Sequence, residues 1–116
     1  MVIAQGDVVW IDLPDAGGSA PAGRRPAVVI SHDRFNRSRI ATVVVVAITS
    51  NLKFAESPGN VRLRKREAGL PRASVVNVSQ IATVDRADVL AKSGTLSRNR
   101  LLQVWDGARL VLEPDR

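Results

Sequence analysis

The side chains best suited to chemistry are arginines, hydroxyls and amides that stand at the ends of predicted strands. Arg24 and Arg25 come directly before Pro26, and the proline biases Arg25 toward an extended backbone. A guanidinium held in this way can bind a phosphate with two donors at once. Thr49 and Ser50 end a long apolar run, where a rigid scaffold can present hydroxyl groups to a cleft. These residue types indicate phosphate chemistry, although a solvated basic turn and an ordinary strand-ending turn would have the same pattern.

Other common catalytic groups are scarce. The 116 residues include no cysteine and a single histidine, His32. Cysteine nucleophiles, thiolate zinc sites and a pair of imidazole acid-base groups are therefore excluded within one chain. The carboxylates do not follow metal-ligand spacing, and no glycine-rich loop matches a nucleotide-binding pattern. We expect a site that uses neither a metal nor a cofactor.

The charge of the chain points to a polyanionic partner. Lysine and arginine outnumber the acidic residues by 17 to 11, which gives a net charge of +6. Basic groups that neutralise phosphates release counterions, so a nucleic acid is one candidate, and an acidic protein is the other. Only Lys53, Lys65 and Lys92 are lysines. The excess of arginine suits phosphate binding, but a bias in codon usage would explain it equally well.

Strands are predicted at 7–13, 26–31, 40–49, 60–64 and 74–84, where β-branched and apolar residues run between turn signals. The segment 40–49 is continuously apolar, which predicts a central strand buried on both faces. Glycines and prolines between the first two strands predict an irregular loop at 14–25.

A helix is predicted after Ser97, which is a favourable N-cap residue. Its apolar positions follow helical spacing along one face, which should pack on the sheet. These positions are Leu101, Leu102, Trp105, Ala108 and Leu112. Trp10 and Trp105 are both expected in the core. Five or six short strands, one C-terminal helix and no alternation of strands with helices predict a single domain over 1–116, mainly β or α+β, with a small SH3-like antiparallel barrel.

No apolar run approaches the length of a membrane-spanning helix. The apolar start of the chain is interrupted at Gly6 and Asp7, too early for a signal peptide. We therefore expect a soluble, cytoplasmic protein without a membrane partner.

The chain resembles the MazF/PemK (Kid) family of toxins over nearly its whole length. The likeness rests on short segments that follow one another in the order typical of the family. These segments are 6–13, 23–30, 48–51, 58–61, 74–81 and 94–97. The resemblance implies a homodimer of SH3-like barrels that cleaves single-stranded RNA without a metal or the ribosome. It also implies an antitoxin partner with an acidic, partly disordered C-terminal segment.

The resemblance places the family's catalytic arginine on Arg25 and its catalytic threonine on Thr49. It places a glutamine that contacts RNA bases on Gln80. In such an enzyme the ribose 2′-hydroxyl attacks the adjacent phosphate, which leaves a 2′,3′-cyclic phosphate and a 5′-hydroxyl end. The substrate is expected to be mRNA, with rRNA and tRNA as alternatives.

Further RNA contacts are expected from side chains near these three. The candidates are Arg24, Ser50, Asn77 and Ser19, and amides such as Asn77 can read base edges. Asn77 could equally well satisfy backbone groups at the rim of the barrel. His32 could also reach the cleft, although an ordinary surface position is favoured for it.

The sequence departs from the family pattern at two places. Many relatives carry Glu-Gln after the Gly-Ser of the first loop, but Gly18 and Ser19 are followed here by Ala20 and Pro21. The preference for an RNA sequence therefore cannot be carried over. Ala47 stands where a proline is common, two residues before the threonine.

Two rival functions are compatible with a small basic barrel. One is a gyrase poison like CcdB, which depends on a tryptophan-glycine pair at the end of the chain; here nine residues follow Gly107. The other is a nucleic-acid-binding module without catalysis, which would need stacking aromatic residues. The chain has only four aromatic side chains, so both rivals are less favoured than the ribonuclease.

Overall fold

The structure is a computed structural model that describes residues 1–13, 17–18 and 23–115. Its strands are β1 (Asp7–Leu13), β2 (Gly23–Val29), β3 (Thr42–Thr49), β4 (Val61–Leu63), β5 (Ser74–Asp85) and β6 (Val89–Thr95). Its helices are α1 (Asp33–Asn36) and α2 (Arg98–Leu112), with short 3-10 helices η1 (Leu52–Glu56), η2 (Glu67–Gly69) and η3 (Arg86–Asp88).

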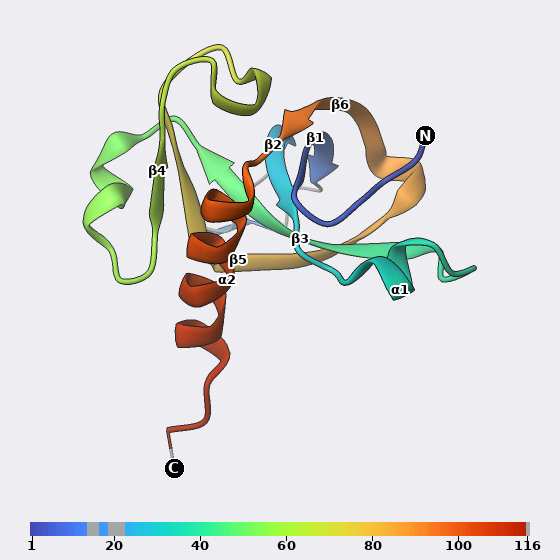
Figure 1. Cartoon of the computed structure of the whole chain (residues 1–116). Helices are drawn as coiled ribbons and strands as arrows, with labels where there is room; N and C mark the ends of the chain where they lie inside the picture. Colours follow the sequence, from blue (N-terminus) through green and yellow to red (C-terminus); the bar gives the residue numbers. More distant parts are fainter. Residues whose placement is uncertain (14–16, 19–22, 116) are drawn as a thin grey trace.

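The strands form one sheet in the order β4-β5-β3-β2-β1-β6, and all the pairings are antiparallel. The sheet curls into a half-barrel, with α2 lying across the side formed by β5 and β4 (Figure 1). The edge strands β4 and β6 are bridged by η2, since the Ser93 hydroxyl donates to the Ala68 carbonyl at 2.9 Å. Gly94 also lies against Ala68, where a Cβ atom would stand 2.5 Å from that carbonyl oxygen. This contact brings the segment before β5 to the open edge of the barrel.

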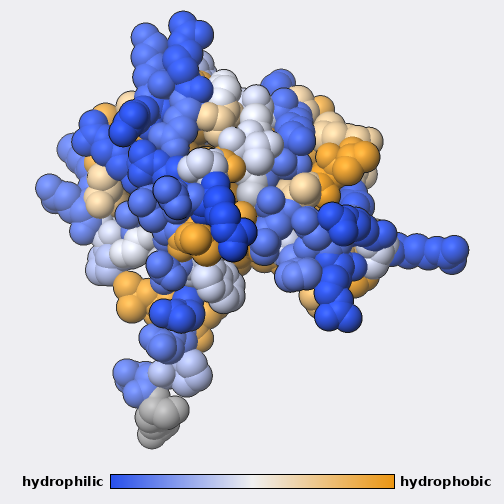
Figure 2. All heavy atoms as spheres, in the orientation of Figure 1, coloured by the Kyte–Doolittle hydropathy of each residue, from blue (hydrophilic) through white to orange (hydrophobic). Residues whose placement is uncertain are grey.

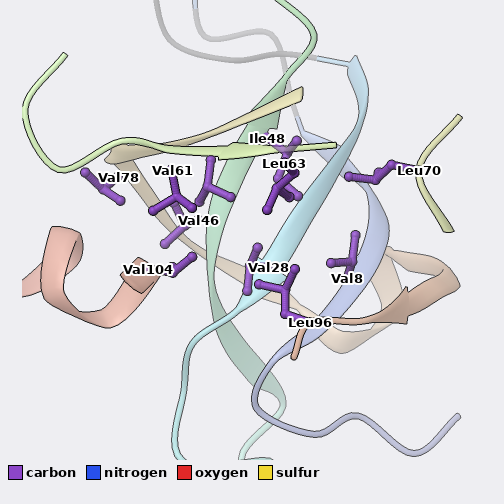
Figure 3. Close-up of a cluster of buried hydrophobic side chains, with 11 residues drawn as sticks. Val8, Val28, Val46, Ile48, Val61, Leu63, Leu70, Val78, Leu96 and Val104 are labelled. Atoms are coloured by element: carbon purple, nitrogen blue, oxygen red, sulfur yellow. The ribbon is translucent and has the colours of Figure 1, made fainter. Parts of the chain in front are cut away.

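The central strand β3 divides its apolar side chains between two buried clusters. Val43 and Val45 belong to one cluster, and Val46 and Ile48 belong to the other. Figure 3 shows the second cluster, in which side chains from the sheet meet Val104 of α2. The prediction of a central strand buried on both faces is therefore confirmed, and the end of this strand is anchored on both sides.

All five predicted strands are present, and their ends differ from the prediction by a few residues at most. β2 begins at Gly23, inside the segment predicted to be irregular, because Gly23 pairs with Leu13 across the sheet. The prediction for 23–25 was therefore wrong, and Arg24 and Arg25 lie on a strand. The sequence did not indicate β6, whose burial pattern does not alternate regularly.

The helix α2 begins after Ser97, whose hydroxyl accepts a hydrogen bond from the Arg100 backbone N–H at 3.2 Å, so the predicted N-cap is confirmed. The expected packing face was right for Ala108, which is buried, but wrong for most of the large apolar residues. Val104 and Gly107 are buried beside Ala108, whereas three of the large residues predicted to pack are exposed. The exposed ones are Leu102, Trp105 and Leu112.

Gly107 explains why this face of α2 packs on the sheet. Because it has no side chain, α2 approaches the backbone of Gly59 more closely than a larger residue would allow. In Figure 2, hydrophobic atoms lie among charged ones around the lower part of the molecule, where Figure 1 shows α2. Trp105 is 48% exposed and Trp10 is half-buried, so neither tryptophan is a fully buried core residue. Within the described residues, no helix is both long and apolar enough to cross a membrane.

Candidate active site

A pocket of about 300 Å³ opens where the end of β3 and the start of β2 meet the segment before β5. It gathers three arginines, two serines and a group of apolar residues. The lining residues are Trp10, Arg24, Arg25, Pro26, Ile48, Ser50, Leu70, Pro71, Arg72 and Ser74. The pocket therefore combines positive charge, hydroxyl groups and an apolar floor, a combination that suits a phosphate attached to a ring.

Arg25 and Thr49 stand at the same end of neighbouring strands. The ladder between β2 and β3 ends at the pair of Ala27 and Ala47. Arg25 lies two residues beyond Ala27 on one strand, and Thr49 lies two residues beyond Ala47 on the other. Antiparallel geometry thus brings together two residues that are far apart in the sequence.

Arg24 extends over the ring of Trp10. Its guanidinium carbon is 5.6 Å from the ring centroid, which is cation-π distance. Trp10 pairs with Pro26, and Asp12 pairs with Arg24, so Trp10 and Arg24 are diagonal neighbours on one face of the sheet. Arg24 is thereby held at the rim of the pocket beside Arg25.

The Thr49 hydroxyl oxygen accepts a hydrogen bond from the backbone N–H of Asn51 at 3.1 Å. The Asn51 side chain in turn accepts from the backbone N–H of Lys53 at 3.2 Å and caps η1. A hydroxyl that accepts one bond keeps its own proton to donate. Thr49 is half-buried and is not among the residues that line the pocket, whereas its neighbour Ser50 is exposed and lines it, so at the end of β3 Ser50 offers a hydroxyl donor to a ligand in the pocket.

Gln80 and Asn77 lie on an irregular part of β5. Val46 pairs with Ile81 and Ile48 pairs with Val76, so residues 77–80 stand opposite Ala47 alone. This extra length bends β5 beside the end of β3. Neither Gln80 nor Asn77 is among the residues that line the pocket.

The Asn77 side chain is engaged in a network of its own. Its carbonyl oxygen accepts from the amide of Asn60 at 3.3 Å and from the hydroxyl of Ser79 at 3.1 Å. Asn60 also accepts from the backbone N–H of Val78 at 2.9 Å. The Asn77 side chain thus contacts neighbouring side chains, and Asn60 is the residue that satisfies a backbone group here; a contact of Asn77 with RNA stays a prediction.

The two remaining candidates are Ser19 and His32. Ser19 lies outside the described residues. His32 is the N-cap of α1, where its Nδ1 accepts from the backbone N–H of Arg34 at 3.0 Å. It lines a different pocket, together with residues of α2 such as Trp105, so the expected surface position of His32 is confirmed.

The sequence missed the segment that leads into β5, from Leu70 to Ser74, and the aromatic residue Trp10 as parts of a site; their polar or aromatic members in the pocket are Trp10, Arg72 and Ser74. Arg72 follows Pro71 shortly before a predicted strand, which is the same signal of an arginine beside a proline that singled out Arg25. Ser74 is 3% exposed, and its hydroxyl donates to the backbone carbonyl of Arg72 at 3.0 Å. Only the fold brings this segment to the start of β2.

The arrangement suits binding and stabilisation of a phosphate group. Arg24, Arg25 and Arg72 can surround an anion with donors that remain charged at neutral pH. Ser50 can add a hydroxyl donor. Across the described ranges, no group of three imidazole or carboxylate side chains could hold a metal ion.

Comparisons with known proteins identify the family. Residues 4–112 match the family described as PemK-like, MazF-like toxin of type II toxin-antitoxin systems. Endoribonuclease MazF6 of Mycobacterium tuberculosis is 43% identical over 113 residues, which cover 97% of this chain and 99% of that protein. Endoribonuclease MazF of Staphylococcus epidermidis is 35% identical, over 89% of this chain and 85% of that protein.

Solved structures share the fold. MazF from Deinococcus radiodurans matches with a TM-score of 0.81 at 24% identity, covering 98% of this chain and 99% of that chain. A mycobacterial endoribonuclease in complex with its cognate antitoxin matches with a TM-score of 0.78 at 21% identity, over 98% and 99% of the two chains. The predicted SH3-like barrel is thus confirmed as a MazF-like half-barrel, and the relatives favour the endoribonuclease over the two rival functions. By its sequence over 4–112, the chain belongs to the PemK-like, MazF-like toxins of type II toxin-antitoxin systems, a family in which its curated relatives are endoribonucleases.

Proposed function

We propose that this toxin cuts single-stranded RNA, chiefly mRNA in the cytoplasm, at short preferred sequences without a metal or the ribosome. The observation that carries the proposal is the placement of Arg25 and Thr49 at one end of the β2–β3 pair. The adjoining pocket adds Arg24, Arg72 and Ser50. Such a group of donors suits the phosphate of an RNA backbone.

In the proposed reaction, the ribose 2′-oxygen forms a bond to the adjacent phosphorus, and the bond from phosphorus to the 5′-oxygen breaks. The 2′-hydroxyl loses a proton to a base, and the departing 5′-oxygen gains one. The products carry a 2′,3′-cyclic phosphate and a 5′-hydroxyl. The protein supplies alignment and stabilises the extra negative charge on the phosphate during the attack.

Arg25 and Thr49 are the residues proposed for that stabilisation. The guanidinium of Arg25 stays protonated at neutral pH, so it serves as a charged donor to the phosphate oxygens and not as the base. The hydroxyl of Thr49 can donate to the same group, since its oxygen is already oriented by the bond from Asn51. Gln80, on the bulge beside the end of β3, is proposed to contact an RNA base.

The proposed partners are a second copy of the chain and an acidic antitoxin. One mycobacterial relative of the same fold was solved with its cognate antitoxin. The net charge of +6 on this chain complements an acidic, partly disordered segment. Light scattering at micromolar concentration checks the homodimer and should give twice the 12.5 kDa of one chain. A mass of one chain would contradict it.

The experiment that tests the proposal incubates purified protein with a long, weakly structured RNA in EDTA and sequences the ends. Arg25→Ala and Thr49→Ala are compared with Arg37→Ala, an exposed arginine directly after α1 and outside the pocket. We expect discrete cuts with 5′-hydroxyl ends from the wild type and from Arg37→Ala, and intact RNA from the two site variants. Intact RNA with the wild type, or loss of cleavage in EDTA, would contradict the proposal.

A further inference from the structure

The pocket beside Arg25 has a feature that phosphate binding alone does not explain. Its lining combines guanidinium groups with apolar side chains, namely an indole ring, an isoleucine, a leucine and two prolines. These apolar residues are Trp10, Pro26, Ile48, Leu70 and Pro71. A phosphate is hydrated and gains nothing from apolar neighbours, whereas a nucleobase has apolar faces and a polar edge.

We propose that Trp10, Arg24 and Arg72 form a nucleotide subsite, in which the base next to the scissile phosphate stacks on Trp10 and Arg72 binds the neighbouring phosphate. This inference rests on the proposed function, because it assigns a place to one nucleotide of the same RNA. The volume of about 300 Å³ lies at the lower end of the range for ligand pockets, so the subsite accepts a single nucleotide.

Trp10 is fixed well enough to serve as a stacking surface. Its backbone is paired on both sides, with Pro26 of β2 and with Ala91 of β6. The guanidinium of Arg24 lies over the ring, 5.6 Å from the centroid, so it restricts the indole further and adds positive charge on one face of it. The side chain remains half-buried, so part of the ring faces the pocket. Stacking on an aromatic ring depends little on the identity of the base. Trp10 therefore adds affinity for a base but no sequence specificity.

Arg72 is placed on the other wall by a buried contact. The hydroxyl of Ser74 donates to the Arg72 carbonyl at 3.0 Å, and Ser74 is held by its pairing with Leu63. The preceding Pro71 limits the backbone at this turn. The Arg72 side chain is exposed at the pocket rim, across from β2. Arg24, Arg25 and Arg72 all belong to the lining of this pocket, so the phosphates next to the bound base have guanidinium groups within the same site.

The test measures single-turnover and steady-state cleavage of a short RNA that contains one mapped cleavage sequence. A second set of RNAs carries an abasic site at each position beside the cut. Trp10→Leu and Arg72→Gln are compared with Phe35→Leu and Arg37→Gln, which change an exposed aromatic residue and an exposed arginine on or beside α1.

We expect Trp10→Leu to raise KM by about tenfold to a hundredfold, the range that base stacking supports, with a smaller change in kcat. With the wild-type protein, an abasic site at one position should raise KM by a similar factor. With Trp10→Leu, the same abasic site should have no further effect on KM, because the two changes delete the same contact. Arg72→Gln should weaken binding at every sequence and reduce the dependence of KM on salt. The two control variants should behave as the wild type.

A fluorescence measurement covers the case in which Trp10→Leu fails to fold. Trp105→Phe leaves Trp10 as the only tryptophan, and RNA with a 2′-deoxy sugar at the cut binds without being cleaved. Quenching of Trp10 by this RNA, but not by the same RNA abasic at the identified position, supports the subsite.

Three results would overturn different parts of the inference. The subsite is wrong and the proposed function stands if the wild type cleaves RNA but RNA does not change the fluorescence of Trp10, and the abasic site raises KM as much for Trp10→Leu as for the wild type. If Arg72→Gln leaves the salt dependence unchanged, Arg72 is not a phosphate ligand. Absence of cleavage by the wild type would overturn the proposed function and the subsite together.

Discussion

Gly107 of α2 lies against Gly59 so closely that a Cβ atom on Gly107 would stand 2.1 Å from the Gly59 carbonyl oxygen. The same Cβ would be 2.9 Å from a methyl group of Val78 on β5. The helix therefore crosses the sheet at a point where only glycine fits. This contact sets which face of α2 is buried and leaves Trp105 exposed.

Gly107→Ala should destabilise the protein, although alanine favours a helix over glycine by about 1 kcal/mol. Overpacking against backbone atoms typically costs about 1–3 kcal/mol, and here the helix must move away from Gly59. We expect a net loss of roughly 1–2 kcal/mol in the free energy of unfolding, measured in urea. Asp106→Ala, at the exposed neighbouring position, is the matched control. Equal stability of both variants would show that the close approach is not rigid.

Arg25→Ala should lower the rate of RNA cleavage by about 100- to 1,000-fold, the usual effect of removing one donor to a developing charge. Arg25→Lys keeps a charge but loses the planar fork, so it should retain a small part of the activity. The rates are measured in single-turnover reactions on one RNA sequence. Full activity of Arg25→Ala would remove Arg25 from the site.

Thr49→Ser should stay active, because the hydroxyl that accepts from Asn51 and donates to the phosphate is kept. Thr49→Val has nearly the same shape and β-propensity but no hydroxyl, and its rate should fall by about 100-fold. Thermal unfolding of the two variants separates this effect from a loss of folding. If the valine variant folds and cleaves as fast as the serine variant, Thr49 has no role in the reaction.

Acid should weaken the contact between η2 and α2. Partial burial raises the pKa of Glu67, but hydrogen bonds from the Arg100 guanidinium, at 2.7 Å, and from the Arg64 backbone N–H outweigh it. The pKa of Glu67 is therefore below its ordinary value of 4.5. A carboxylate with a lowered pKa stabilises the fold above its unfolded pKa, and this contribution is lost as the pH falls through the folded pKa.

Glu67→Gln should accordingly reduce the free energy of unfolding at neutral pH, and this deficit should shrink as the pH falls below 4.5 and through the folded pKa of Glu67. Urea unfolding of the wild type and the variant at neutral pH and at a series of decreasing acid pH values measures the difference. Glu113→Gln, an exposed carboxylate after α2, is the control. A deficit of Glu67→Gln that persists unchanged in acid would show that the charge of Glu67 is not what stabilises the contact.

The sequence alone was sufficient where local rules decide the structure. The β-branched and aromatic run of β1, the long apolar run of β3 and the N-cap Ser97 all have the predicted structure, because burial and capping act within a few residues. The family resemblance of the ordered segments was likewise visible before the fold. Arg25 and Thr49 could be singled out from their positions beside strand ends and from that resemblance.

Other features depend on contacts between distant segments, which no local pattern encodes. The exposed face of α2 follows from the fit of Gly107 against Gly59, and helical spacing by itself favoured a different face. Arg72 and Trp10 join Arg25 only because η2 meets β6 and brings the segment before β5 to the open edge of the barrel. The sequence thus determined the strands, the helix and the chemical groups available. Tertiary packing decided which of those groups share a pocket, because close contacts between backbone segments that are far apart in the chain depend on the whole sheet.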